Sequence, residues 1–160
     1  MSIDYSHYIE QLGLAKHPEG GYYKEIYRCP AETSIDQENR NLATSIYFLL
    51  TSSDVSKLHR LKSDEIWYYH AGAPLSIYLI HPDGKLEILK LGIEITRGYY
   101  PQAIIPAGCI FGAKVDNEDS FTLIGCMVSP GFDFKDFELP PREILLQKYP
   151  DHSEIIKQLT

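Results

Sequence analysis

The residues best suited to chemistry gather between Lys57 and Gly72, in a stretch that reads KLHRLKSDEIWYYHAG. It contains two histidines, His59 and His70, and an acidic residue, Glu65, that precedes a run of aromatic residues. An imidazole titrates near neutral pH, and burial raises the pKa of a carboxyl group toward the same range. Such a pair can exchange a proton with a bound molecule. We therefore interpret this stretch as one wall of a chemical site.

Strand alternation predicts which of these side chains share a face. If Glu65 points inward, Trp67 and Tyr69 point inward too, because side chains alternate along a strand with a period of two. His59 lies on the preceding segment with matching parity. His70 falls on the opposite face unless a bulge shifts it. The predicted pocket is therefore lined by His59, Glu65, Trp67 and Tyr69.

The elements that must position these residues are short strands separated by turns. Turns recur about every eight to twelve residues with no long helix between them, which is typical of an all-β sandwich or barrel. The polar stretch from Ala31 to Asn41 has no period and is predicted to be an exposed loop. The predicted strands are Tyr22–Arg28, Ala43–Thr51, Asp54–His59, Glu65–His70, Leu75–Ile80, Lys85–Leu91, Gln102–Ile105, Cys109–Lys114 and Phe121–Ser129.

Helices are expected only at the two ends of the chain. Apolar residues recur at helical spacing between Tyr5 and Leu12, and Ser2 or Asp4 can cap this helix. The pattern predicts a single domain over residues 1–160, with a β core at about 14–138 and a helical tail at 140–160.

Composition excludes several classes of partner. The 22 acidic residues outnumber the 15 Lys and Arg, which gives a formal net charge of −7 and argues against binding to nucleic acid or to an acidic membrane surface. No apolar run approaches the roughly 20 residues of a membrane span, and no export signal is visible. The three cysteines are dispersed, with no CxxC pair. The chain is expected to be cytoplasmic.

Two spacings resemble the motifs of the cupin superfamily. The first superfamily motif, G-x5-H-x-H-x3,4-E-x6-G, is similar to His59-x-Leu61, Glu65 and Gly72 in this chain. The second, G-x5,7-P-x-G-x2-H-x3-N, is echoed by Gly98, Pro106-Ala107-Gly108 and Phe111. The stretches HPEGGYYKEIYR and SPGFDFKDFEL look like those of a small, uncharacterised, epimerase-like cupin group that is related in fold to the dTDP-sugar epimerases.

This resemblance implies a fold and an assembly. Cupins form a jelly-roll barrel, or double-stranded β-helix, which here would carry a short helix at each end. Most cupins pair, so a homodimer is expected, with the Tyr22-Tyr23 and Tyr99-Tyr100 edges available to the interface.

The resemblance also bears on metal binding. A metal cupin is similar to a site of three His and one Glu around a divalent ion. Leu61 and Phe111 occupy two of those positions here, so only His59 and Glu65 remain. We predict no metal and no other cofactor; if a metal binds, His70 is the third ligand, beside His59 and Glu65.

Three functions stay open. The first is a metal-free epimerase or isomerase in which His59 and Glu65 act as the catalytic acid–base pair. The second is a module that binds a small molecule without chemistry, and the third is a metal-dependent cupin with a reduced ligand set. Sugar epimerases of the superfamily bind nucleotide phosphates through basic residues, for which Arg28, Arg60 and Lys62 are the candidates. The predicted ligand-binding residues are Trp67, Tyr69, Tyr78, Gln102 and Phe111.

Overall fold

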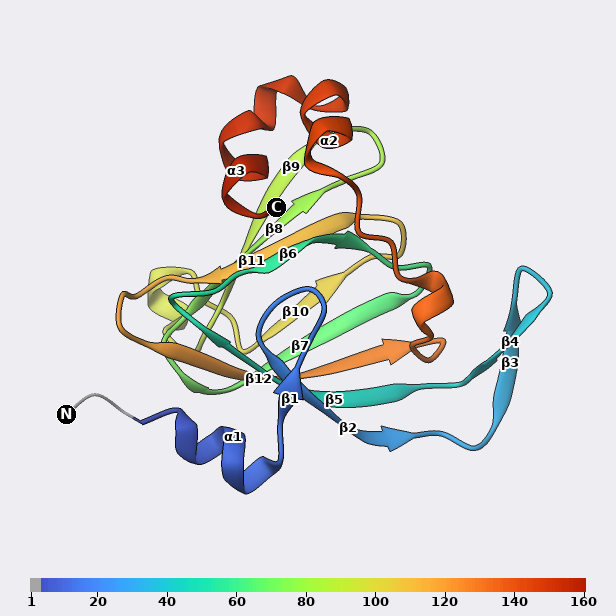
Figure 1. Cartoon of the computed structure of the whole chain (residues 1–160), viewed down its shortest axis with the longest axis horizontal. Helices are drawn as coiled ribbons and strands as arrows, with labels where there is room; N and C mark the ends of the chain where they lie inside the picture. The colour runs from blue at the N-terminus through green and yellow to red at the C-terminus, as the bar shows by residue number, and fades with distance from the viewer. Residues whose placement is uncertain (1–3) are drawn as a thin grey trace.

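A computed structural model describes residues 4–160, and most of its strands form two antiparallel sheets (Figure 1). The first sheet has six strands, in the order β1 (Ala15–Lys16), β2 (Tyr22–Arg28), β5 (Thr44–Thr51), β12 (Phe121–Ser129), β7 (Asp64–Gly72) and β10 (Gln102–Ile105). The second sheet has four, in the order β6 (Ser56–Arg60), β11 (Ile110–Val115), β8 (Leu75–Ile80) and β9 (Leu86–Leu91).

The main core lies between the two sheets. Side chains at every second position point into it, so Phe48 and Leu50 of β5 meet Trp67 of β7 and Phe111 of β11. β12 runs between β5 and β7, and Cys126 is opposite both Ile46 and Trp67 in this register. The inner face of the first sheet therefore presents residues of β5, β7 and β12 side by side.

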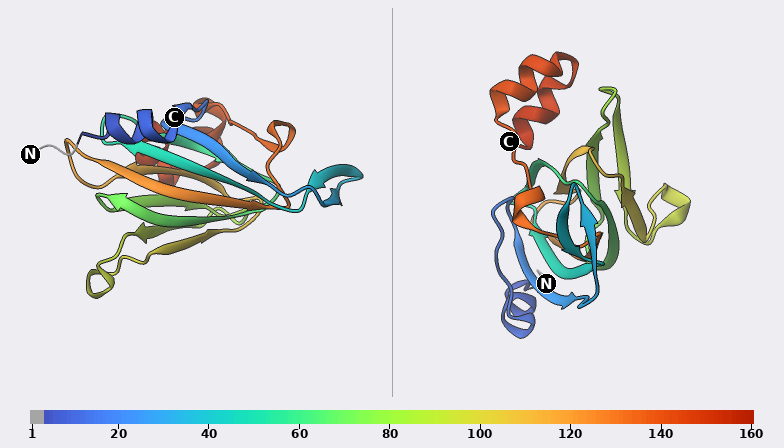
Figure 2. Two further views of the ribbon diagram at one scale, coloured as in Figure 1. Left: turned by 90° about the horizontal axis from the view of Figure 1, so that it is seen from below. Right: turned by 90° about the vertical axis from the view of Figure 1, so that its right-hand side faces the viewer.

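Helices cover the outer faces of the sheets (Figure 1, Figure 2). The helix α1 (Ser6–Leu12) packs on the first sheet over Leu49, Phe121 and Leu123. The helices α2 (Arg142–Lys148) and α3 (Ser153–Gln158) pack on Leu58, Ile80 and Ile110 of the second sheet. Three short 3-10 helices complete the set: η1 (Ile95–Arg97), η2 (Phe134–Asp136) and η3 (Pro150–His152). In residues 4–160 no helix is both long and apolar enough to cross a membrane.

The chain was predicted to be all-β, and it consists mostly of antiparallel sheets with few short helices. The first helix is also found where it was predicted. Its cap residue is Tyr5, not the predicted Asp4, although Asp4 accepts a hydrogen bond from the Ser6 backbone N–H at 3.0 Å. Ser2, the other predicted cap, lies outside the described residues.

The predicted loop from Ala31 to Asn41 is wrong. This segment forms a hairpin of β3 (Glu32–Ile35) and β4 (Glu38–Asn41), which projects at the right of Figure 1. Asp36 and Gln37 make the turn with φ of 50° and 67°, the positive values that tight hairpin turns require. Backbone pairing and contacts to distant residues hold the hairpin, so its own side chains show no alternation of apolar and polar types.

Candidate functional site

The inner face of the first sheet contributes to a cavity of about 510 Å³. Its walls come from β2, β5, β7 and β12, from the turn after β1, and from the loop after β12 that carries Phe132 and Phe134. His59 and Glu65 both line it. The structure thus brings the two predicted catalytic residues to the same cavity.

The His59 side chain, on β6, is held in one orientation. It is buried, and its ring packs against the Phe111 ring with a centroid distance of 4.1 Å. Nδ1 lies 2.7 Å from the Lys57 carbonyl oxygen. Because a carbonyl oxygen only accepts hydrogen bonds, Nδ1 carries a proton. The second ring nitrogen, Nε2, lies 3.1 Å from Oε2 of Glu19.

The Glu19 carboxyl group shares a proton with His59. Its Oε1 accepts a hydrogen bond from the Ser56 hydroxyl at 2.8 Å, so Oε2 is the atom that faces the imidazole. The Nε2 of a neutral imidazole and the oxygen of a carboxylate are both acceptors, and two acceptors do not sit at 3.1 Å without a proton between them. Burial raises the pKa of Glu19 and lowers the pKa of His59. Both shifts favour a neutral pair in which Glu19 carries that proton.

The turn from His17 to Gly21 positions Glu19. The Gly20 backbone N–H donates to the His17 carbonyl at 3.0 Å, and the Gly21 N–H donates to Asp54 Oδ2 at 2.9 Å. Gly20 has a φ of 108°, and a Cβ atom there would lie 2.0 Å from the Val55 carbonyl oxygen. Only glycine fits this approach, which explains the Gly20-Gly21 pair next to Glu19.

Glu65 is the second carboxyl group of the cavity. Burial raises its pKa to about 7, and the nearby Glu19 adds to the rise, while His59 and a hydrogen bond from Trp67 oppose it. The Trp67 Nε1–H donates to Glu65 Oε1 at 2.7 Å. Cys126 also lines the cavity, and burial raises the pKa of its thiol well above the ordinary value. Glu65 therefore changes protonation near neutral pH, whereas Cys126 remains a thiol.

His17 is a further imidazole in the lining. The Glu19 backbone N–H donates to its Nδ1 at 3.1 Å, and the Tyr23 ring lies at a centroid distance of 4.5 Å. Burial lowers the pKa of His17, although Glu19 opposes this change. The cavity thus contains two imidazoles that stay neutral near pH 7.

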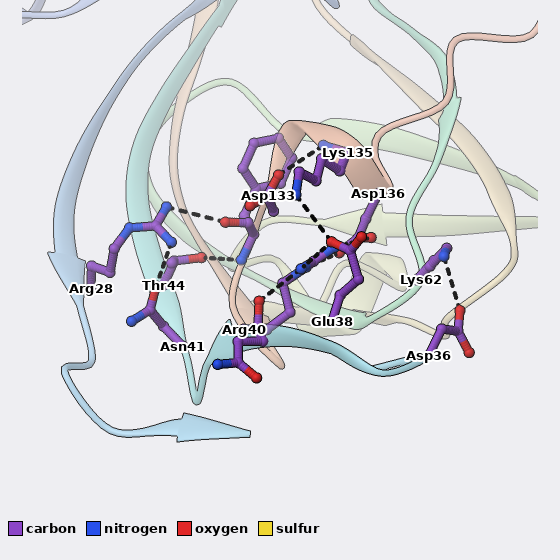
Figure 3. Close-up of polar contacts among 12 residues, drawn as sticks. Arg28, Asp36, Glu38, Arg40, Asn41, Thr44, Lys62, Asp133, Lys135 and Asp136 are labelled. Carbon is purple, nitrogen blue, oxygen red and sulfur yellow. Dashed lines mark hydrogen bonds and ion pairs between the residues drawn. The ribbon is translucent and has the colours of Figure 1, made fainter. Parts of the chain in front are cut away.

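The one arginine in the lining, Arg28, makes four hydrogen bonds, and Figure 3 shows the one to Asn41. Its Nε and Nη2 donate to the two oxygens of Glu25 at 2.8 and 2.7 Å. Its Nη1 donates to Asn41 at 2.8 Å, and Nη2 also donates to the Phe132 carbonyl at 3.1 Å. The guanidinium fastens β2 to β4 and to the loop after β12.

The other two predicted phosphate-binding residues lie outside this cavity. Arg60 pairs with Glu138, and Lys62 pairs with Asp36 at 2.9 Å. They line a second hollow of about 410 Å³. Leu61 lines both hollows.

The predicted ligand-binding residues are dispersed. Trp67 and Phe111 are buried in the core, in contact with Glu65 and His59, and Tyr69 donates to the Gly72 carbonyl at 2.5 Å. Tyr78 points to the outer face of the second sheet, where it packs with the C-terminal helices. Gln102 is exposed on the edge strand β10. None of these five residues is part of the lining of the cavity. Tyr78 and Gln102 are kept from it because each lies at an outward position of its strand.

The donor atoms do not fit the metal site of other cupins. The ladder between β12 and β7 skips His70, as a bulge does, yet this side chain is exposed on the outer face beside Gly125. His70 therefore does not converge with His59 and Glu65. Within residues 4–160 no group of three or more His, Cys, Asp or Glu side chains is arranged to hold a metal ion.

The fold and the motifs identify the class of protein. The model of a family described as Cupin superfamily (DUF985) matches residues 6–140. The chain therefore belongs to this family of cupins. Oxalate decarboxylase of Bacillus subtilis shares the fold at a TM-score of 0.57 and 16% identity, over 91% of this chain and 36% of that one.

Three relatives are much more similar. Protein SO0799 of Shewanella oneidensis is 46% identical, with a TM-score of 0.91, over 100% of this chain and 98% of that one. A hypothetical protein of Leishmania major is 38% identical, with a TM-score of 0.92, over 97% of each chain. The uncharacterized protein YML079W of Saccharomyces cerevisiae is 34% identical over 144 residues, or 80% of this chain and 71% of the relative. None of these names states an activity.

Sequence reasoning missed Glu19 and His17 as site residues. Both lie in the HPEGG stretch, which the Pro and Gly content identifies correctly as a turn. The signal available was an acidic residue directly before two glycines, a place where a buried carboxyl group can be held by backbone geometry. Nothing in that stretch reveals that its partners are His59 and Ser56.

Proposed function

We propose that this chain binds a small organic molecule in the cavity and moves a proton at a carbon next to a carbonyl group, as an epimerase or isomerase does. The observation that carries the proposal is the pair of buried acid–base groups in one cavity: Glu65, whose pKa is raised to about 7, and the proton-sharing couple of His59 and Glu19. A base and an acid with divided roles are what such a reaction needs.

The roles follow from protonation. Ionised Glu65 removes the proton from carbon, and the electron pair of the C–H bond moves to the carbonyl oxygen as an enolate forms. The proton that His59 and Glu19 share then passes to the enolate. Return of the proton from Glu65 through solvent restores the starting state, so no oxidant or reductant is consumed. We also propose the finer assignment to the epimerase-like cupin branch, with the two sheets acting as its jelly-roll container.

Solvent deuterium exchange tests this function. Keto sugars, free and nucleotide-linked, and amino-carbonyl compounds are incubated with the protein in D₂O, and loss of the proton next to the carbonyl is followed by NMR. We expect exchange with at least one of them, reduced about 10²- to 10⁴-fold in His59→Gln and Glu65→Gln. Lack of exchange across the panel, or undiminished exchange in both variants, would refute the proposal.

A binding module without chemistry is the second candidate. The observation that favours it is the large share of aromatic and aliphatic residues in the lining, which include Tyr23, Ile46, Phe48, Phe132 and Phe134. In that case a ligand raises the melting temperature, and His59→Ala changes its affinity without changing any rate.

A further inference from the structure

The two carboxyl groups of the cavity are buried without a permanent counter-ion. Glu19 and Glu65 are each only 7% exposed. Their partners are the Ser56 hydroxyl, the Trp67 indole, and imidazoles whose pKa values are lowered by burial. No lysine or arginine of residues 4–160 forms an ion pair with either group.

The other buried acidic residue, Asp136, has a basic partner. Asp136 is 6% exposed, and Arg40 donates to its two oxygens at 2.7 and 2.9 Å (Figure 3). A buried carboxylate normally requires such a partner, because ionisation without one is very costly. Glu65 and Glu19 therefore lack the cation that the fold supplies to Asp136.

The charges of the lining suit a cation better than an anion, because four carboxyl groups outnumber the two basic side chains, Lys24 and Arg28. Four of the five N–H donors of Arg28 are occupied by Glu25, Asn41 and Phe132. Asp133 is one of the four carboxyl groups. Four aromatic rings line the same space: Tyr23, Phe48, Phe132 and Phe134. A cation placed over such rings is stabilised by their quadrupoles.

We propose that the cavity takes a small organic ligand that carries an ammonium group, whose charge is held by Glu65 and by the aromatic rings around it. This inference rests on the proposed function, because it names the class of substrate that the same cavity would take. An amino sugar or another amino-carbonyl compound meets the requirements of the charge site and of the proposed reaction, because it has an ammonium group and a carbon next to a carbonyl. The anionic compounds of the exchange panel, phosphorylated or nucleotide-linked, are then expected to be the poorer substrates.

Ligands that share a scaffold and differ in charge test this inference. The probes are benzylamine, benzyl alcohol and benzoate, and glucosamine, glucose and glucuronate, each titrated by calorimetry and by thermal shift. We expect the ammonium member of at least one series to bind about tenfold or more tightly than the neutral member, with no binding of the carboxylate. Tighter binding of a carboxylate, or failure of both amines to bind at millimolar concentration, would overturn it.

Substitutions assign the charge selection to Glu65. Removing one partner of a buried charge pair is costly, so Glu65→Gln should weaken amine binding about 30-fold or more and leave the neutral member unchanged. Glu118→Gln, which removes the same charge from an exposed turn outside the lining, should bind the amine like the wild type. If a folded Glu65→Gln protein still binds the amine more tightly than the neutral ligand, the inference is wrong. Amine binding without deuterium exchange would instead leave it standing and count against the proposed reaction.

Discussion

At the scale of single residues, the unusual feature is a carboxyl group that changes protonation near neutral pH. The pKa of Glu65 rises from 4.5 to about 7 because its charged form is desolvated. Its neighbour Glu19 is also shifted upward, so the two acids resist simultaneous ionisation. This arrangement costs stability, and a cost of this kind is common where a group is poised for chemistry.

That cost has a predictable dependence on pH. Between about pH 4.5 and 7 the folded chain holds the Glu65 proton that the unfolded chain has lost, so the free energy of unfolding falls as pH rises through this window. The free energy of unfolding of the wild type, measured relative to that of Glu65→Gln, should fall by about 3 kcal/mol as the pH rises from about 4.5 to 7. Urea unfolding of both proteins across the window measures the difference. A difference that stays constant with pH would show that Glu65 titrates normally.

The sequence leads to part of this site. Strand parity places His59 and Glu65 on one side, and both line the cavity, whereas Trp67 and Tyr69, which the same parity adds to them, are not in its lining. Glu19 could not be found in this way, because its partner Ser56 is 37 positions away and the contact depends on how the turn packs on β6. Tyr78 and Gln102 also lie on predicted strands, but the sequence pattern did not show which face of each strand points into the molecule.

At the scale of elements, the His17–Gly21 turn decides where Glu19 lies. Gly20→Ala would place a methyl group against the Val55 carbonyl oxygen. It would also force alanine into a positive φ that is unfavourable for it. We expect a loss of about 2–4 kcal/mol in the free energy of unfolding, with loss of ligand binding in any folded fraction. Urea denaturation and thermal shift check both effects.

Gly98→Ala provides the matched control. Gly98 also has a positive φ, 81°, but nothing lies within 4 Å of the added Cβ atom. The control should therefore lose only about 1 kcal/mol, the cost of the left-handed conformation. Equal losses in the two variants would show that steric contact at Gly20 is unimportant.

The hairpin of β3 and β4 is held by long-range charge pairing. Arg40 on β4 bonds to Asp136 of η2, which is 96 positions away in the sequence, and neither residue marks its own segment as structured. This distance explains why the hairpin was predicted as a loop. The strands β5, β8 and β12 were predicted well because β-branched and aromatic residues indicate a strand locally.

Removing one partner of this pair should loosen the hairpin. Asp136→Asn removes the buried carboxylate from Arg40 and leaves it only the more exposed Glu38, so we expect a melting temperature lower by several degrees and faster proteolysis between residues 31 and 41. Lys62→Gln breaks the exposed pair with Asp36 and should change neither. Unchanged proteolysis in Asp136→Asn would mean that backbone pairing alone holds the hairpin.

At the scale of the whole molecule, assembly stays a prediction. Several large apolar side chains are exposed in the segment around β10, among them Ile93, Ile95 and Ile104 at 60–68%. Such exposure favours association of chains. We expect light scattering on the purified protein to give twice the mass of the 18.3 kDa chain, and a monomeric mass at micromolar concentration would contradict the expected homodimer.

Leu61 has a consequence for the size of molecule that the protein could handle. It is buried, and it is the residue common to the linings of both hollows. This aliphatic side chain therefore lies where the two hollows approach each other. We expect a smaller side chain, as in Leu61→Ala, to widen the connection between them, so that a longer molecule could extend from one hollow into the other. Stabilisation of the variant, and not of the wild type, by elongated ligands would be the measurable sign of that connection.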